Sequence, residues 1–480
     1  MTHTPMTGTR AAWAALGGDP ALLSRVEPVV RAEALPARLP VRELARACVG
    51  ACALAAAELT AARTRRAVPR VRVDDGAVAA AFTSERRLLV DGREPVTFAP
   101  LSGFWRTGDG GWVRTHANYP HHRAALLTAL GLSVGSEDAV DSVDAVAARL
   151  AERTAVDVED AVYAAGGLAV ALRTPEEWAK HPQGASVAQR PLLSRARIGE
   201  GPPRPLPALT GDPSLPASGL RVLDLTRVIA GPVATRTLAL LGADVLRIDS
   251  PRLPELPDQH ADTGFGKRSA ALDLAARADR RTFDELLAEA DVVVTGYRPG
   301  ALDRFGLGPR ALAERRPGIV VAGLSAWGDY GPWAGRRGFD SLVQVASGIA
   351  SLEGSPERPG ALPAQALDHG TGHLLAAAVL RSLTEAMAGG GTWSVRLALA
   401  QTAGWLMGAS LGGALGGALG GALGGEDGNS ATYDPTPWLA ETDSPLGRLR
   451  YAPSPVSFAG GPDNWSRPPG RWGADTPEWR

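Results

Sequence analysis

The chain has 480 residues, of which 45% are hydrophobic and 21% charged, and its formal net charge is −1. This composition is typical of a globular protein with a large core and two or three domains. A near-neutral net charge argues against nucleic acid or an anionic membrane as a partner. The two cysteines, Cys48 and Cys52, are too few for a disulfide framework or a zinc site, and buried reduced thiols favour the cytoplasm. We therefore expect a cytoplasmic protein without a metal centre.

Residues 1–87 are expected to form an alanine-rich half of helices and short strands. Within it, residues 39–45 align with residues 362–368 at an offset of 323, and each segment runs into an alanine-rich helix. The alignment indicates a weak internal repeat, in which Ala45 stands where the second copy has Asp368. Compositional bias shared by two alanine-rich helices is the alternative explanation.

Residues 88–183 are expected to form a small α+β domain. The segment from Trp105 to His116 predicts a hairpin, because Gly-Asp-Gly-Gly stands between two short apolar runs. A helix is expected over 122–132, and further helical segments over 142–183. Many prolines without a clear period mark residues 184–218 as a linker or an extended crossing strand.

Strand and helix patterns alternate in residues 219–409. Apolar runs predict strands at 220–225, 242–249, 291–295 and 319–324, with helices at 234–241, 280–290 and 309–315 between them. This βαβ series predicts an open, mostly parallel, Rossmann-like sheet with flanking helices, whose ligands bind at the carboxyl ends of the strands. A glycine-rich linker (410–430) and a C-terminal return segment (431–480) follow.

Asp368 is the first candidate for chemistry. It is followed by a turn that contains Gly370 and Gly372, and then by an alanine-rich helical run, 374–387. A carboxylate near a helix start, with glycines that allow close approach of a ligand, suits a nucleophile on an acyl group. The alternative is that Asp368 only caps the helix.

Basic residues near the predicted strand ends suit a phosphorylated ligand, although ordinary surface charge is the alternative reading. They are Arg227, Arg247, Lys267, Arg268, Arg298 and Arg304. No G-x-G-x-x-G follows the first strand and no G-x-x-x-x-G-K-[ST] occurs, which argues against a nicotinamide dinucleotide fold and a P-loop.

Several motifs in this region resemble the class III CoA-transferases (the CaiB/BaiF family) and occur in that family's order. They are Leu220-Arg-Val-Leu-Asp-Leu-Thr-Arg-Val-Ile-Ala-Gly-Pro232, Leu241-Gly-Ala-Asp-Val-Leu-Arg-Ile-Asp249, Gly266-Lys-Arg-Ser-Ala-Ala-Leu-Asp-Leu274, residues 290–304, Gly331-Pro-Trp-Ala-Gly-Arg-Arg-Gly-Phe-Asp340 and the Asp368 segment.

The resemblance implies that Asp368 attacks an acyl-CoA thioester to give an aspartyl mixed anhydride. The CoA thiolate then returns to form an aspartyl-CoA thioester, and a carboxylic acid takes over the CoA. CoA is thus a substrate and acyl carrier, with no permanently bound cofactor. Backbone N–H groups of Gly370 and Gly372 are candidate oxyanion donors. The implied CoA nucleotide site comprises Arg227, Val228, Ile229, Ala230, Arg247, Lys267, Arg268, Tyr297, Arg298 and Arg304.

Two other functions remain open. A non-catalytic CoA- or acyl-CoA-binding protein is one. An α-methylacyl-CoA racemase is the other, but the family's racemases carry Gly-His-Asp where this chain has Gly338-Phe339-Asp340, and phenylalanine cannot move a proton. His369 and His373 could in principle substitute, and we rank transferase above racemase.

The order of parts departs from the family. Segments 105–131, 161–182 and 444–450 resemble the family's small domain and closing segment, yet the first two precede the first strand. The chain thus resembles a degenerate second half fused ahead of an intact first half. This order puts the family's intertwined homodimer in question and leaves open what covers the acyl site.

Overall fold

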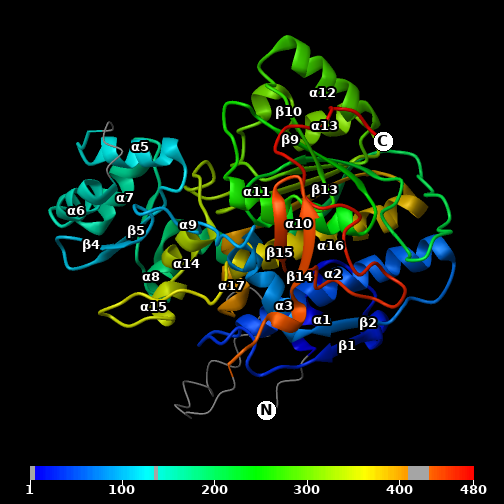
Figure 1. The fold of residues 1–480 in the computed structure, drawn as a ribbon, viewed down its shortest axis with the longest axis horizontal. Helices are drawn as coiled ribbons and strands as arrows, with labels where there is room; N and C mark the ends of the chain where they lie inside the picture. The colour runs from blue at the N-terminus through cyan, green and yellow to red at the C-terminus, as the bar shows by residue number, and fades with distance from the viewer. Residues whose placement is uncertain (1–5, 134–138, 409–431) are drawn as a thin grey trace.

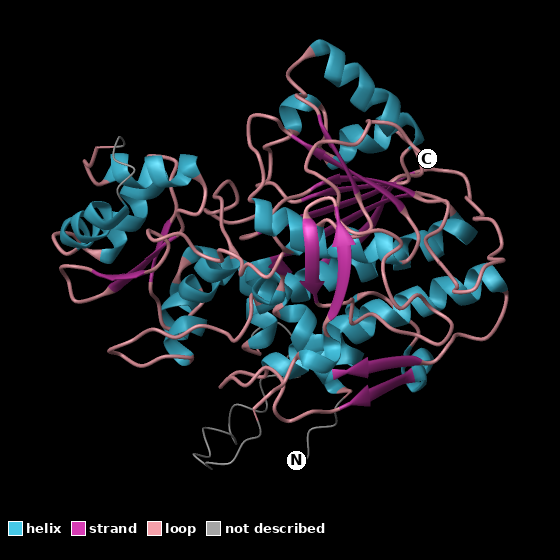
Figure 2. Cartoon of the chain, in the orientation of Figure 1, coloured by secondary structure: helices cyan, strands magenta, loops and turns pink. Residues whose placement is uncertain are grey.

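The computed structural model describes residues 6–133, 139–408 and 432–480. Its centre is a seven-stranded sheet of order β10-β9-β8-β11-β12-β13-β7, parallel throughout except for β7 (Figures 1 and 2). The strands are β8 (Arg221–Leu225), β9 (Asp244–Asp249), β10 (Arg268–Ala271), β11 (Val292–Thr295), β12 (Val320–Ser325), β13 (Thr392–Ala398) and β7 (Leu193–Gly199). The predicted α/β class with a mostly parallel sheet is confirmed.

Alternate residues of each strand face two different layers of helices. Val222 of β8 belongs to the core shared with α10 (Ala230–Leu240) and α16 (Ala366–Gly389). Leu223 belongs to a second core on the side of α12 (Arg277–Glu289) and α13 (Pro309–Arg315). Burial on both faces explains why these strands are continuous apolar runs.

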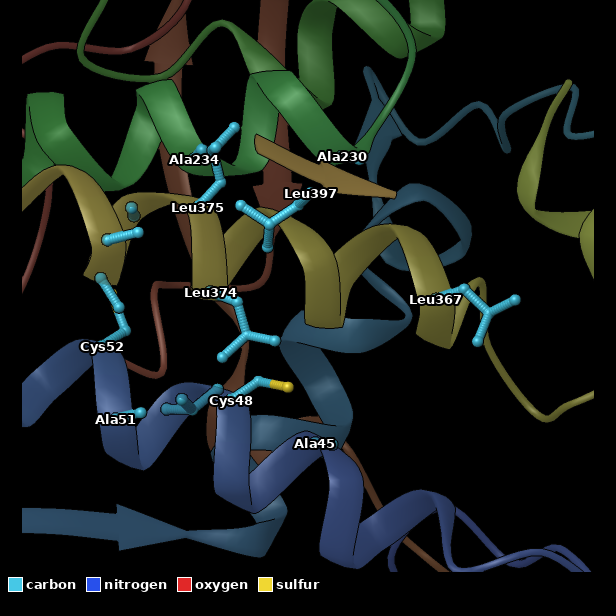
Figure 3. Close-up of a cluster of buried hydrophobic side chains, with 14 of the residues drawn as sticks. Ala45, Cys48, Ala51, Cys52, Ala230, Ala234, Leu367, Leu374, Leu375 and Leu397 are labelled. Carbon is cyan, nitrogen blue, oxygen red and sulfur yellow. The ribbon is translucent and has the colours of Figure 1, made fainter. Parts of the chain in front are cut away.

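The N-terminal region packs into the main core and does not fold apart from it. Helix α2 (Val41–Thr64) lies along α16, and Ala45 and Cys48 face Leu374 in Figure 3. By length and composition α2 could cross a membrane, but 94% of its most apolar window is buried in the structure. Alanines on both helices allow this close approach.

The two proposed repeat copies have the same succession of elements. Helices α2 and α16 each have 24 residues. The first is followed by β2 (Val71–Asp74) and α3 (Asp75–Phe82), and the second by β13 and α17 (Leu399–Leu406). Strand β2 pairs with β1 (Val26–Val29) in a separate two-stranded sheet. The order helix, strand, helix in both copies agrees with the repeat.

The small domain has a core of its own, built on the three-stranded sheet β4-β5-β6. The expected hairpin is β4 (Phe104–Arg106) and β5 (Trp112–Thr115), which pair antiparallel, and β6 is Ala169–Ala171. Around it lie α5 (Pro120–Ala129), α6 (Ala139–Leu150) and α7 (Ala155–Ala164). Helices α8 (Pro175–Lys180), α9 (Pro182–Ala188), α14 (Asp340–Ala346) and α15 (Ile349–Leu352) lie between this domain and the sheet in Figure 1.

Residues 184–218 were expected to be a linker or an extended crossing strand. Within them, residues 193–199 form β7, the antiparallel edge of the main sheet. Strand β10 was not predicted, because it holds arginine, serine and two alanines and is not an apolar run. In the return segment, β14 (Ala440–Ser444) pairs with β15 (Gly447–Tyr451), and β15 pairs with β3 (Leu89–Val90). The linker 410–430 lies outside the described residues.

Candidate active site

Asp368 lies inside α16 and not ahead of it. The helix begins at Ala366 with Gln365 as N-cap, so Asp368 is the third helical residue. Its backbone N–H donates to Oδ2 of Asp340 at 2.9 Å. The side chain of Asp340, which begins α14, therefore caps α16, and the capping role considered for Asp368 belongs to Asp340.

Gly370 and Gly372 are helical as well, which corrects their interpretation as a turn with free N–H groups. Beyond the first turn, helix N–H groups bond to the carbonyl four residues back, so these two are poor candidates for oxyanion donors. A Cβ on Gly372 would lie 2.5 Å from the carbonyl oxygen of Ala230, and one on Gly370 would lie 3.4 Å from Sγ of Cys48. The glycines therefore allow α16 to pack closely against α10 and α2.

Asp368 lies at the junction of two cavities. The larger, of about 690 Å³, opens beyond the carboxyl ends of β8, β9, β10, β11 and β12. The smaller, of about 60 Å³, lies towards the N-terminal region. Both are lined by Tyr119, Val228, Phe339 and Asp368, so these four side chains form the boundary between the cavities.

The larger cavity is strongly basic. It lies where the chain order of the strands reverses, between β8 and β11, which is the usual ligand position in open α/β sheets. Its arginines are Arg227, Arg252, Arg298, Arg304, Arg336 and Arg337, against two lining aspartates, Asp273 and Asp368. Among the described residues, Arg298 and Arg304 form no ion pair, whereas Arg252 pairs with Asp273 at 2.7 Å. A cavity of this size and charge can hold a phosphorylated ligand.

The structure divides the ten residues assigned to CoA by resemblance into two groups. Arg227, Val228, Ala230, Tyr297, Arg298 and Arg304 line the larger cavity, and Ile229 lines the smaller. Arg247, Lys267 and Arg268 line neither and are at least 97% buried. Sequence reasoning did not assign Arg252, Arg336 and Arg337, although Arg252 lies three residues beyond β9 and the other two belong to a quoted motif.

Each of the three buried cations neutralises a carboxylate within the fold. Nζ of Lys267 lies 3.0 Å from Asp224 Oδ2, and burial lowers the pKa of Lys267 to about 8 although Asp224 opposes the change. Arg268 donates to both carboxylate oxygens of Asp244, at 2.8 and 2.9 Å. These pairs connect different strands of the sheet, so they stabilise the scaffold without facing the cavity.

Arg247 binds Glu255, a buried residue that sequence reasoning missed. Glu255 accepts hydrogen bonds from Tyr119 Oη at 2.6 Å, from the N–H of Val228 at 3.1 Å and from Arg247 at 3.2 Å. Burial would raise the pKa of Glu255, but Arg247 and Arg227 lower it to about 2. An ionised Glu255 thus ties the small domain to the loop after β8.

Val228 carries backbone strain at this point. Its φ is 70°, and a β-branched residue in the left-handed region is a genuine outlier. Such strain persists where surrounding contacts enforce it and is concentrated at functional sites. Here the bond from the Val228 N–H to Glu255 holds the loop, and Val228 lines both cavities.

Four carboxyl groups line the smaller cavity: Asp368, Asp340, Glu85 and Asp258. Burial, followed by the charges of Asp340 and Glu85, raises the pKa of Asp368 well above its ordinary value. Burial also raises the pKa of Asp340 to about 6. Glu85 differs: burial would raise its pKa, but a hydrogen bond from His369 lowers it below the ordinary value. Burial and these acidic neighbours therefore oppose ionisation of the Asp368 carboxyl group.

The histidines near Asp368 in sequence do not reach either cavity. His369 is fully buried, with Nε2 3.2 Å from Glu85 Oε2, and His373 is stacked under Phe82. His116 of the small domain does line the smaller cavity, and its ring stacks on Phe339 with centroids 3.7 Å apart. Burial and then Arg114 lower the pKa of His116 to about 3, so its imidazole is neutral. No sequence signal marked His116.

Comparison with known proteins identifies the part of the chain that holds Asp368. The family model for CoA-transferase family III matches residues 217–436. This part of the chain belongs to CoA-transferase family III. An acetyl-coenzyme A transferase of Hypoxylon pulicicidum is 35% identical over 42% of this chain and 35% of its own length. An acetyl-CoA:oxalate CoA-transferase of Acetobacter aceti is 37% identical over 31% of this chain and 41% of its own.

Among solved structures, a CAIB/BAIF family protein from Brucella suis is 26% identical, with a TM-score of 0.39, over 49% of this chain and 65% of that one. In both curated relatives the match covers less than half of the relative's own length. Residues 85–122, which supply much of the smaller cavity, lie outside the family match.

Proposed function

We propose that the protein transfers CoA from an acyl-CoA to a carboxylic acid through Asp368. The observation that carries the proposal is the position of this carboxyl group between an arginine-lined cavity and a smaller one. The larger cavity suits the phosphates and the extended arm of CoA, and the smaller suits the acyl group. The thioester carbon would then lie beside the Asp368 carboxylate.

The reaction needs no external proton acceptor. An Asp368 oxygen forms a bond to the thioester carbon, the C–S bond breaks, and the thiolate leaves. The thiolate next attacks the aspartyl carbonyl of the mixed anhydride and displaces the acyl carboxylate. The acceptor carboxylate then attacks the aspartyl-CoA thioester and again releases the thiolate, which attacks the acyl carbon of the new anhydride. Asp368 leaves as a carboxylate and the acceptor leaves as its CoA thioester.

Each addition also develops an oxyanion that needs a hydrogen-bond donor. With Gly370 and Gly372 inside the helix, we assign this role to Gln259 on α11 (Pro257–Thr263). Gln259 lines the smaller cavity together with Asp368, and its Nε2 is buried and makes no hydrogen bond in the described structure. An unsatisfied buried donor beside a nucleophile is the feature that a developing oxyanion would use.

Trapping the intermediate tests the mechanism. The protein is incubated with an acyl-CoA and hydroxylamine, and the peptide that contains Asp368 is analysed by mass spectrometry for a hydroxamate. We expect the adduct in the wild type and its absence in Asp368→Asn, together with loss of CoA transfer. Tight CoA binding without an adduct or transfer would favour the non-catalytic CoA-binding function.

Racemase activity is a second candidate, because His116 lines the smaller cavity with Asp368. Two-base exchange at an α-carbon needs a second acid/base group, and His116 rather than His369 or His373 is placed to supply it. Deuterium exchange at the α-carbon of a 2-methylacyl-CoA, lost in His116→Phe, would establish this activity. CoA transfer without deuterium exchange at the α-carbon would exclude the racemase and leave the transferase as the proposed activity.

A further inference from the structure

One wall of the smaller cavity comes from a segment outside the family match. Residues 95–98 line the cavity, and the segment 93–99 is held at both ends. Asp258 accepts the N–H of Val96 at 2.9 Å and pairs with Arg93, and Asn118 accepts the N–H of Ala99 at 3.0 Å. We call residues 93–99 the strap. This part of the chain therefore forms a wall of the cavity next to Asp368 without a second protomer.

The space behind the strap is small. A cavity needs about 10–15 Å³ for each water-sized group. The volume of about 60 Å³ therefore accommodates roughly four to six non-hydrogen atoms. Val96 and Phe98 of the strap form part of the wall, and the buried ring of Phe339 forms another part. An acyl chain of eight carbons exceeds this space unless the strap side chains are removed.

The lining also disfavours a second negative charge. Its carboxylates are those of Asp368, Asp340, Glu85 and Asp258, and its one cationic side chain is that of Arg86. Arg86 is already engaged, since it donates to the carbonyl of Pro363 at 3.1 Å and its Nε lies 3.5 Å from Glu85 Oε1. A free carboxylate at the far end of an acyl group would enter an acidic pocket without an available cation.

We propose that the site selects short, uncharged acyl groups, those of monocarboxylic acids with about two to five carbons by the volume per water-sized group. The strap sets the length limit through Phe98, and Glu85 rejects dicarboxylic acids. This inference rests on the proposed function, because it concerns the acyl group that Asp368 receives. Phe98 and Val96 are 37% and 71% exposed, so both can be truncated without opening the core.

The test compares kcat/KM for propionyl-, butyryl-, succinyl- and octanoyl-CoA with acetate as acceptor. We expect propionyl- and butyryl-CoA to exceed succinyl- and octanoyl-CoA by at least ~10-fold, the scale of methylene and charge discrimination. Phe98→Ala should raise the octanoyl rate relative to the propionyl rate ~10-fold. Glu85→Gln should raise the succinyl rate relative to the butyryl rate. Val156→Ala, at an exposed position outside both cavities, is the matched control and should change neither ratio.

Equal rates for succinyl- and butyryl-CoA, or for octanoyl- and butyryl-CoA, would overturn the inference and leave the proposed transferase intact. No transfer from any of the four, with no hydroxamate at Asp368, would overturn the proposed function and this inference with it. A selectivity that persists unchanged in both Phe98→Ala and Glu85→Gln would show that these two residues do not set it.

Discussion

Replacing Asp340 by asparagine tests how the acidic surroundings control the nucleophile. Asp340 is 1% exposed and its Oδ2 accepts the N–H of Asp368 at 2.9 Å. Two unit charges ~5 Å apart at an effective dielectric constant of ~20 repel by ~3 kcal/mol, or ~2 pKa units. Removing the Asp340 charge should therefore lower the pKa of Asp368. Because only ionised Asp368 is a nucleophile, the acid limb of activity should move to lower pH.

The assay is the pH dependence of kcat/KM for CoA transfer, measured from about pH 4 to pH 9 around the ordinary and raised carboxyl pKa values. Asp340→Asn should move the acid limb down by roughly one to two units. Asp340→Glu keeps the charge and serves as the matched control, so its limb should stay near that of the wild type. An unmoved limb in Asp340→Asn, or equal shifts in both variants, would refute the electrostatic reasoning and reduce Asp340 to a helix cap.

Four further predictions follow from the described contacts. Lys267→Met leaves Asp224 as an unpaired buried charge, so it should lower unfolding free energy by ~3–5 kcal/mol in denaturant titrations; weaker CoA binding at unchanged stability would contradict this. Arg304→Ala removes a free cavity cation and should weaken CoA binding ~10–100-fold by calorimetry at unchanged Tm, as expected for a charged hydrogen bond. Gln259→Leu should lower kcat by ~10²-fold or more with a smaller change in KM. The pKa of Asp368 is raised in the folded state, so its contribution to stability is complete below the ordinary Asp pKa and is lost as pH rises through the folded value. Asp368→Asn should therefore raise Tm at pH 8 and change Tm little at pH 4. An equal change of Tm at both pH values would exclude the raised pKa as its origin.

The strands of the main sheet were predictable because they are buried on both faces. Runs such as residues 292–294 and 319–322 are apolar throughout and are separated by helical patterns. Strand β10 and the bounds of β7 escaped prediction because the residues of these strands are charged or small. Both depend on neighbouring strands for their hydrogen bonds, and a local pattern does not contain that information.

The helix that carries Asp368 shows tertiary packing overriding local preference. Glycine in a helix interior costs ~1 kcal/mol relative to alanine, so Gly370 and Gly372 were interpreted as a turn. The structure keeps them helical because any side chain at Gly372 would collide with the carbonyl of Ala230. The glycines belong to a helix contact between segments more than a hundred residues apart.

The amino-acid sequence by itself predicted the α/β class, the resemblance to CoA-transferase family III and Asp368 as a candidate nucleophile, because apolar periodicity and ordered motifs are local properties of the chain. Only the tertiary structure decided which cations face the cavity. Arg247, Lys267 and Arg268 are buried against carboxylates, whereas Arg252, Arg336 and Arg337 reach the ligand space. It also brought the strap and His116 beside Asp368. Burial and charge pairing depend on contacts between distant segments, and the fold creates those contacts.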